Sequence, residues 1–315
     1  MYYRTLGRTG LKISALSLGT VSLGVNYGIE APDQFGCPRN AEVLGLIDEA
    51  VNIGINLFDT APNYGDSENL LGQALKHHPD CLIATKVSIP RDEKKVVLGG
   101  EPLSEFIEKS LRRSLEALQR DTLDIVQIHN ATEDVLKHGE MAENLLRFKE
   151  KGLIRCIGAS VYTEDEALAV LSAGCFDVLH VAYNILDRRM EKKVFPAAKE
   201  NGVGIITRSA LLKGALTYKA QWLPKELSKL KNIVENIREE ATNGSWEQLQ
   251  ETALLFCLSS PYIDSVLIGP RTRQELQVAL ESQDKGPLSE ELLKTLSTFQ
   301  LQEDRLLNPS FWPIQ

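Results

Sequence analysis

Apolar residues follow two different spacings along the chain, one typical of helices and one typical of buried strands. In several stretches they recur every three or four residues, which places them on one face of an amphipathic helix. Two such stripes are Val43, Leu46, Ile47, Ala50 and Val51, and Phe106, Ile107, Leu111, Leu115 and Leu118. Four helical stretches end at a glycine that an apolar run follows closely, at Gly54, Gly152, Gly174 and Gly202. Glycine readily takes the left-handed conformation that ends a helix and turns the chain into a strand.

The strands predicted after these helices are continuous apolar runs. Such runs are typical of parallel sheets that are covered on both faces. They occupy residues 16–20, 55–60, 81–87, 123–129, 154–160, 178–183, 203–208 and 265–269. Eight strands separated by helices predict an α/β fold of the (β/α)8 TIM-barrel type. Barrels of this kind reach 315 residues as one unit, so we expect a single domain over residues 1–315.

The N-terminus and three long segments depart from this repeat. Residues 3–6 and 11–14 flank the turn Gly7-Arg8-Thr9-Gly10, which predicts a β-hairpin that closes the bottom of the barrel. Residues 21–38, residues 211–244 and the tail after Asp304 are too long for ordinary connections. We expect these long loops at the C-terminal face, where they shape a substrate mouth. Their aromatic residues either line this mouth or pack the loops onto the barrel: Tyr27, Phe35, Trp222, Phe311 and Trp312.

Composition and charge exclude several classes of protein. Hydrophobic residues make up 43% of the chain and charged residues 25%, as in soluble globular proteins. The net charge of −8 and the lack of a basic run disfavour a nucleic-acid partner. No apolar run approaches the roughly 18 residues of a membrane span, and no signal peptide is evident. We therefore expect a cytoplasmic protein without nucleic-acid or membrane partners, while its state as monomer or homo-oligomer stays open.

The cysteines indicate neither a disulfide framework nor a metal site. Their number is odd and they form no C-x-x-C pair: Cys37, Cys81, Cys156, Cys175 and Cys257. We expect reduced, mostly buried thiols and no bound metal. Cys37 lies in the first long loop, where a thiol is more often inert than reactive.

Polar residues at the ends of the predicted strands form the candidate active site. Asp59, Lys86 and His129 each end an apolar strand, and Tyr64 follows Asp59 in the next loop. Because catalytic residues of such barrels come from the C-terminal ends of strands, we expect these four side chains at one rim. A neighbouring ammonium favours the phenolate of a tyrosine and lowers its pKa toward the working range. The set therefore predicts proton transfer to or from a substrate oxygen, and hydride transfer from a cofactor is its natural complement.

Several motifs give this prediction a family context. They are L-G-R-T-G-L-K-I-S at 6–14, D-T-A-P-N-Y-G-D-S-E-N-L-L-G at 59–72, T-K at 85–86, I-H at 128–129, I-G-A-S at 157–160 and I-G-P-R-T at 268–272. Over nearly its whole length the chain resembles the aldo-keto reductases. The resemblance implies an NAD(P)H-dependent oxidoreductase that interconverts a carbonyl compound and an alcohol. It also implies a catalytic tetrad of Asp59, Tyr64, Lys86 and His129, in which Tyr64 is the general acid.

The resemblance further implies which residues hold the nicotinamide nucleotide across the barrel mouth. The positions that match the family's contacts are Gly19, Thr20, Asp59, Ser160, His180, Arg208, Ser209, Leu211 and Lys213. Three residues depart from the usual pattern. Val161 replaces an asparagine, His180 stands where a carboxamide-binding glutamine is common, and Arg208 stands where a tyrosine often stacks on the nicotinamide. Carboxamide recognition therefore differs in detail, although a guanidinium plane can also stack.

At the adenine end the resemblance points to Gly269, Arg271 and Glu275. Arg271 suits a 2′-phosphate near a helix N-terminus, which favours NADP(H). Glu275 suits the free ribose hydroxyls of NAD(H), and Ala279 replaces an adenine-contacting asparagine. However, Thr272-x-x-Glu275 is also a capping box, in which Glu275 bonds back to its own helix start. We expect NADP(H), with NAD(H) as the alternative.

The function has further alternatives. The motif V-N-Y-G-I-E at 25–30 resembles a loop of aldo-keto reductases of sugar metabolism, which makes a sugar-derived carbonyl a candidate substrate beside a broad range of small aldehydes. Similar barrels also serve as nucleotide-sensing regulatory subunits with slow turnover. A metal-dependent lyase or hydrolase needs a cluster of carboxylates and histidines at the strand ends, and only Asp59 and His129 qualify.

Overall fold

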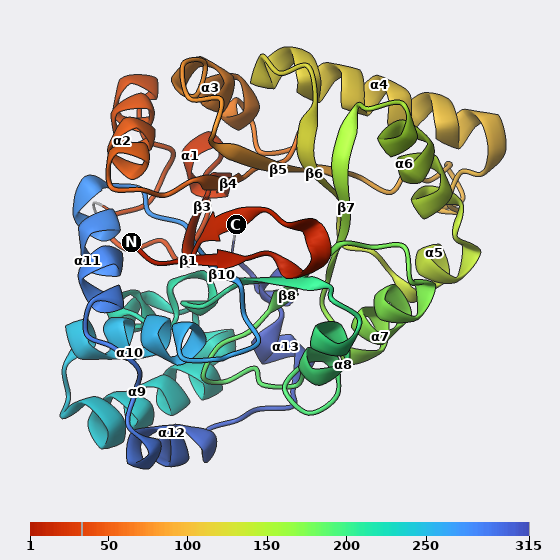
Figure 1. The fold of residues 1–315 in the computed structure, drawn as a ribbon. Coiled ribbons are helices and arrows are strands. Elements are labelled where there is room, and N and C mark those ends of the chain that lie inside the picture. Colours follow the sequence, from red (N-terminus) through yellow and green to blue (C-terminus); the bar gives the residue numbers. More distant parts are fainter. Residues whose placement is uncertain (33, 315) are drawn as a thin grey trace.

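Eight parallel strands close into a barrel in the computed structural model, which describes residues 1–32 and 34–314 (Figure 1). The strands are β3 (Leu16–Gly19), β4 (Leu57–Asp59), β5 (Leu82–Val87), β6 (Leu123–Ile128), β7 (Ile154–Val161), β8 (Val178–Ala182), β9 (Gly204–Arg208) and β10 (Ser265–Ile268). Each pairs with the next in sequence, and β10 closes the ring on β3. All eight lie at the predicted positions, with bounds that differ by at most two residues. The predicted (β/α)8 fold is confirmed.

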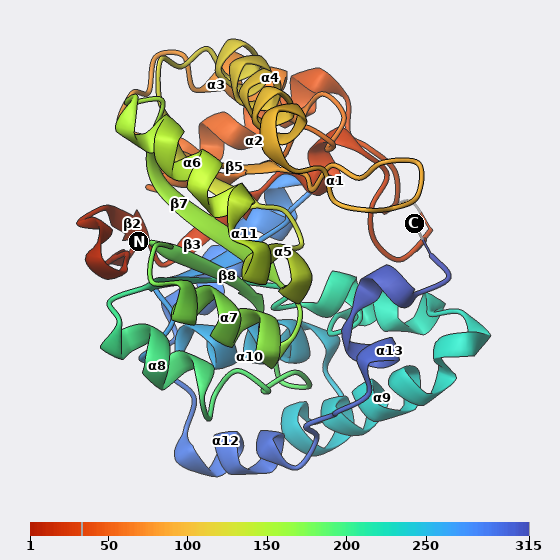
Figure 2. The ribbon, with the colours of Figure 1, turned by 90° about the vertical axis from the view of Figure 1, so that its right-hand side faces the viewer.

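Helices surround the barrel (Figures 1 and 2). They are α1 (Val21–Gly24), α2 (Asn40–Asn52), α3 (Ser67–Ala74), α4 (Gly100–Leu118), α5 (Glu133–His138), α6 (Glu140–Glu150), α7 (Glu164–Ala173), α8 (Val194–Glu200), α9 (Ser228–Thr242), α10 (Trp246–Leu258), α11 (Arg273–Gln283), α12 (Glu290–Ser297) and α13 (Asp304–Leu307). None of these helices combines the length and the apolar character needed to cross a membrane.

The amphipathic stripes hold with one exception. In α2 the residues Val43, Leu46, Ile47 and Ala50 are buried as predicted. In α4, however, Phe106 is 37% exposed, and Leu103 is buried in its place. The buried face of α4 follows Leu103, Ile107 and Leu111 in steps of four residues, and Phe106 lies on its flank.

The predicted N-terminal hairpin seals one end of the barrel. Strands β1 (Tyr3–Thr5) and β2 (Lys12–Ser14) pair antiparallel, with a short 3-10 turn between them. Three apolar side chains of this segment, Leu6, Leu11 and Ile13, pack against the innermost apolar residues of the strands, namely Leu57, Leu82, Ala84, Ile125, Cys156, Val178 and Ile206. Gly204 allows this contact, because a Cβ there would lie 2.4 Å from the Leu6 side chain. The bottom of the barrel is therefore an apolar plug.

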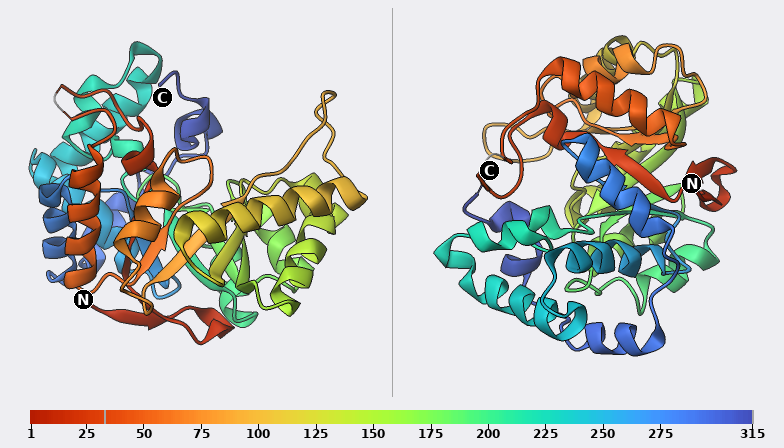
Figure 3. Two further views of the ribbon diagram at one scale, coloured as in Figure 1. Left: turned by 90° about the horizontal axis from the view of Figure 1, so that it is seen from above. Right: turned by 90° about the vertical axis from the view of Figure 1, so that its left-hand side faces the viewer.

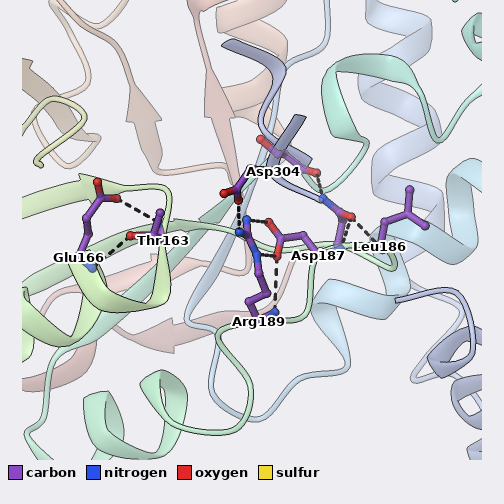
Figure 4. Close-up of polar contacts among 8 residues, drawn as sticks. Thr163, Glu166, Leu186, Asp187, Arg189 and Asp304 are labelled. Atoms are coloured by element: carbon purple, nitrogen blue, oxygen red, sulfur yellow. Dashed lines mark hydrogen bonds and ion pairs between the residues drawn. The ribbon is translucent and has the colours of Figure 1, made fainter. Parts of the chain in front are cut away.

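The opposite end carries α1 and the C-terminal segment, as two further views show (Figure 3). The segment 211–244 is not the plain loop that we expected, because it includes α9. The C-terminal segment is tied to the chain after β8, where Leu301 N donates to Leu186 O at 2.9 Å. Nearby, Arg189 forms ion pairs with both Asp187 and Asp304 (Figure 4). The tail is therefore fixed at this end of the barrel.

Side-chain caps stabilise two helix starts beside this end. Thr163 Oγ1 accepts from Glu166 N at 3.2 Å, and Glu166 Oε2 accepts from Thr163 N at 3.0 Å (Figure 4). Ser245 Oγ accepts from Gln248 N in the same way at the start of α10. The side chains of Thr163, Glu166 and Ser245 therefore cap these helices.

Removing the plug should destabilise the whole barrel. Leu6 is fully buried, so Leu6→Ala leaves a cavity and should cost about 2–5 kcal/mol of unfolding free energy. Tyr2 is 61% exposed on the same hairpin, so Tyr2→Ala should change stability by no more than about 0.5 kcal/mol. Urea unfolding followed by circular dichroism measures both. Equal stabilities of the two variants would show that the hairpin contributes no packing.

Candidate active site

Asp59 and Lys86 form a buried ion pair inside the barrel. Lys86 Nζ donates to Asp59 Oδ1 at 2.5 Å and to the backbone oxygen of Thr60 at 2.8 Å. The side chains of Lys86 and Asp59 are only 2% and 4% exposed. An unpaired charge is strongly disfavoured at this depth, so each residue allows the other to be buried.

Tyr64 and His129 lie beside this pair. Lys86 Nζ is 4.9 Å from the centre of the Tyr64 ring. The ring centres of Tyr64 and His129 are 5.9 Å apart, and the planes meet at 84°. The structure therefore brings together the four residues that the strand ends predicted, with the phenol flanked by an ammonium and an imidazole.

Burial controls the protonation of these side chains. Burial raises the pKa of Tyr64. The charge of Lys86 lowers this pKa, as we expected, but its effect is smaller than that of burial, so the net pKa is raised. Burial lowers the pKa of Lys86, but Asp59 and Tyr64 outweigh this effect and the net pKa is raised. Burial and the charge of Lys86 lower the pKa of His129 to about 3. At neutral pH the site therefore presents an ammonium, a protonated phenol and a neutral imidazole.

Two glycines hold the loop that carries Tyr64. A Cβ on Gly24 would lie 1.8 Å from the carbonyl oxygen of Tyr64 and 2.3 Å from Ser67 Oγ. A Cβ on Gly65 would lie 2.1 Å from the carbonyl oxygen of Gly24. Ser67 Oγ donates to the same Tyr64 carbonyl at 2.7 Å. The sequence analysis missed Gly24, because contact between two segments so far apart in the chain leaves no local pattern.

Gln127 is a buried polar residue that the sequence did not single out. It is fully buried in β6, where it is in register with Lys86 of β5. Its Nε2 donates to Asp59 Oδ2 at 3.1 Å, and its Oε1 lies 2.9 Å from His180 Nδ1. The available signal was its position two residues before His129, which places both side chains on the same face of the strand.

The positions assigned to the nicotinamide lie on three adjacent strands. Ser160 of β7 and His180 of β8 are paired in register, and both are buried. Arg208 of β9 stacks on Tyr162, with its guanidinium carbon 3.9 Å from the ring centre, and donates to the Val161 backbone oxygen at 3.0 Å. The side chain of Val161 packs in the apolar core, because side chains alternate along a strand. Val161 therefore does not replace the polar contact that an asparagine would make at this position.

Two buried polar atoms next to these positions have no hydrogen-bond partner in the described residues, His180 Nε2 and Arg208 Nε. Buried polar atoms of folded proteins are nearly always paired, so each of these points to a missing partner. A nicotinamide carboxamide carries both a donor and an acceptor. The residues present therefore fit this group.

The segment assigned to the pyrophosphate is strained. Ser209, Leu212 and Lys213 have φ angles of 61°, 44° and 56°. Such positive values in residues other than glycine are costly and cluster at ligand sites. Lys213 Nζ donates to the backbone oxygen of Ile314 at 3.3 Å and lies 4.8 Å from the centre of the Tyr27 ring. Leu211 is half-buried between Ser209 and this strained pair.

On the first strand, the predicted nucleotide residues adjoin the tetrad. Thr20 N and Oγ1 donate to the backbone oxygen of Asp59 at 2.9 and 3.1 Å. Gly19 precedes Thr20 and is paired in register with Asp59. The aromatic residues of the long segments differ in their surroundings. Tyr27 contacts Lys213, Trp312 is buried in the core, and Trp222 and Phe311 are exposed.

At the adenine end, the carboxylate of Glu275 is fully engaged. Its Oε1 accepts from Lys219 Nζ at 2.9 Å, and its Oε2 accepts from Arg271 N at 2.7 Å. Thr272 Oγ1 accepts from Glu275 N at 3.1 Å, so Glu275 does bond back to its helix start. Arg271 Nε donates to Gly36 O at 3.0 Å. Gly269 is exposed beside this helix start, whereas Ala279 is buried in the core.

The remaining candidates show no reactive chemistry. Cys37 Sγ donates to Leu23 O at 3.0 Å, and burial raises its pKa, which disfavours the reactive thiolate. Within residues 1–32 and 34–314, no cluster of three or more His, Cys, Asp or Glu side chains has a geometry that holds a metal ion.

Comparison with known proteins places this site in a family. Residues 15–300 match the profile of the aldo/keto reductase family. The chain belongs to this family. An aldo/keto reductase from Bacillus halodurans, AKR11C1 in its holo form, superimposes with a TM-score of 0.78 at 27% identity, over 97% of this chain and 99% of that one. The predicted fold and family are thereby confirmed, and the protein is an oxidoreductase.

Two curated relatives of this aldo/keto reductase have named activities. L-galactose dehydrogenase of Arabidopsis thaliana is 32% identical over 284 residues, which are 84% of this chain and 83% of the relative. NADH-specific methylglyoxal reductase of Escherichia coli is 33% identical over 226 residues, which are 67% of this chain and 68% of the relative. Both act on carbonyl or alcohol groups, in agreement with carbonyl reduction as the general chemistry of the family.

The Gly24 contact yields a test of how Tyr64 is positioned. In Gly24→Ala the added methyl group displaces the Tyr64 backbone, and a shift near 1 Å should lower kcat about a hundredfold. Gly45→Ala is the control, because its Cβ meets only the end of the flexible Arg273 side chain. Steady-state kinetics and a circular dichroism spectrum check both variants. Full activity in Gly24→Ala would show that this contact does not position Tyr64.

Proposed function

We propose that this barrel, as one domain, reduces an aldehyde or ketone to an alcohol, or catalyses the reverse reaction, with Tyr64 as the general acid and base. The observation that carries the proposal is the position of the Tyr64 phenol between the Lys86 ammonium and the neutral His129. A bound nicotinamide nucleotide supplies the hydride for this reaction. Ser160, His180 and Arg208 are the residues that would hold its nicotinamide end.

Each residue of the tetrad has a separate task in this proposal. His129 is uncharged and donates a hydrogen bond to the substrate oxygen, which orients the carbonyl group. Tyr64 gives its proton to that oxygen as negative charge develops there. Lys86 stabilises the phenolate that is left, and Asp59 holds Lys86 charged and in place. In the direction of oxidation, the phenolate takes the proton back from the alcohol.

Tyr64→Phe tests this assignment. The variant keeps the ring but loses the proton, so kcat should fall by about 10²–10⁴ while nucleotide affinity is unchanged. Tyr2→Phe, at the opposite end of the barrel, should keep wild-type turnover. Absorbance of the reduced nucleotide measures turnover, and its fluorescence measures binding. Unchanged turnover in Tyr64→Phe would contradict the role of this residue, and a wild type that binds nucleotide without turnover would favour the sensor alternative.

We propose a sugar-derived carbonyl compound or alcohol as the substrate. The support is the similarity to L-galactose dehydrogenase and the phenol groups of Tyr27 and Tyr162, which contact Lys213 and Arg208. The two phenol hydroxyls suit a substrate with several hydroxyl groups. The same assay compares aldoses with methylglyoxal, and a higher kcat/KM for methylglyoxal would favour the small-aldehyde alternative.

We propose NADP(H) as the preferred nucleotide. Binding of the NAD(H) ribose through Glu275 would need a free carboxylate, but both oxygens of Glu275 are bonded within the protein. With Glu275 engaged, Lys219 and Arg271 leave this region positive, and the start of α11 adds its own attraction for anions.

Fluorescence titration with NADPH and NADH tests the preference. Arg271→Ala should weaken NADPH binding about tenfold and leave NADH binding unchanged, because a charge-assisted bond to the 2′-phosphate is lost. Arg273→Ala is the matched control, since Arg273 points to Glu49 of α2 at 3.1 Å. Tighter binding of NADH than NADPH by the wild type would contradict the proposal.

A further inference from the structure

A chain of hydrogen bonds runs inside the barrel from the ion pair to His180. Lys86 Nζ donates to Asp59 Oδ1, Gln127 Nε2 donates to Asp59 Oδ2, and Gln127 Oε1 faces His180 Nδ1. None of the four residues joined by these hydrogen bonds is more than 3% exposed. Gln127 therefore links the ion pair to His180, a residue assigned to the nicotinamide end of the site.

Gly158 makes this connection possible. Gln127 lies on β6 and His180 on β8, so the glutamine side chain has to cross β7 between them. It crosses at Gly158, which is in register with Gln127. A Cβ at this position would lie 3.3 Å from Gln127 Cγ and 2.9 Å from the backbone oxygen of Val178. A larger residue at position 158 would push the two side chains apart.

The donor and acceptor roles in these hydrogen bonds are fixed by Asp59. Asp59 is ion-paired with Lys86, so its carboxylate accepts hydrogen bonds and does not donate them. Gln127 must then turn its amide nitrogen toward Asp59 and its carbonyl oxygen toward His180. His180 Nδ1 must carry the proton to donate to this oxygen, which leaves Nε2 as a bare acceptor. This Nε2 is the buried atom that has no hydrogen-bond partner within residues 1–32 and 34–314.

We propose that Gln127 is a positioning residue that fixes the tautomer of His180, so that His180 Nε2 accepts a hydrogen bond from the amino group of the nicotinamide carboxamide. The inference rests on the proposed function. A glutamine at position 180 has both a donor and an acceptor and can rotate to suit either orientation of the carboxamide. A histidine held in one tautomer offers an acceptor alone, so it selects one orientation and leaves the carboxamide oxygen to the Ser160 hydroxyl.

His180 Nε2 is buried near the cation Arg208. The atom is sealed from solvent in the described structure. Arg208 lies on β9, and its charge contributes to lowering the pKa of His180, after burial and the charge of Lys86. Its guanidinium contacts Tyr162 and one backbone oxygen, and its Nε finds no hydrogen-bond partner within residues 1–32 and 34–314. Arg208 Nε therefore remains a donor for the nicotinamide end of the site.

A nucleotide analogue tests the proposal by binding alone. The 3-acetylpyridine analogue replaces the carboxamide amino group by a methyl group, so it cannot donate to Nε2. The wild type should bind the natural nucleotide about tenfold more tightly than the analogue. In Gln127→Met the proton is free to move to Nε2, so this ratio should fall toward one. His180→Gln should also lower the ratio, because the glutamine can turn its amide to donate to the acetyl oxygen. Gln73→Met, an exposed change on α3, should behave as the wild type.

Nitrogen-15 spectra of the nucleotide-free protein provide a second readout that needs no cofactor. His180, assigned by its loss in His180→Gln, should show a protonated Nδ1 and a bare Nε2 in the wild type. A protonated Nε2 would overturn the proposal, and so would an equal analogue ratio in the wild type and in Gln127→Met. Failure of the wild type to bind either natural nucleotide would instead overturn the proposed function.

Discussion

Lys86 and Asp59 meet at 2.5 Å in a part of the barrel that water does not reach. Neither charge is stable there alone, and removal of one partner of such a pair typically costs about 3–5 kcal/mol. The pair also sets the chemistry around it. The ammonium stands beside the Tyr64 ring, and the carboxylate orients Gln127 and, through it, His180. Stability and reactivity of this site therefore depend on the same two side chains.

The barrel supplies the conditions under which this pair works. Inward-facing residues alternate with outward-facing ones along each strand, so they form layers across the interior. The lowest layer is apolar and is closed by the hairpin. The ion pair and Gln127 lie above it, and the residues of the mouth follow. Because an apolar layer lies beneath the charges, their interactions are stronger than in water. Burial and the nearby charge of Lys86 also keep His129 neutral.

The sequence predicted the features that have a local pattern. Asp59, Lys86 and His129 follow apolar runs, so their place at the strand ends could be inferred. Gln127 could be placed on the same face of its strand as His129, but a polar residue inside an apolar run gives no indication of its partner across two strands. Gly24 and Lys219 were missed for a related reason, since their contacts with the Tyr64 loop and with Glu275 join distant segments. The prediction that Phe106 is buried was wrong, because apolar character alone does not fix which edge of a helical face is covered.

The separation of the plug from the mouth has an evolutionary consequence. Leu6, Leu11 and Ile13 close the barrel at one end, while the segments that carry Tyr27 and Lys213 lie at the other. Substitutions, insertions and deletions in the mouth segments leave the packing of the plug untouched. A lineage can therefore exchange these segments and acquire new substrates without refolding the scaffold, whereas drift in the hairpin is restrained by every strand that it touches.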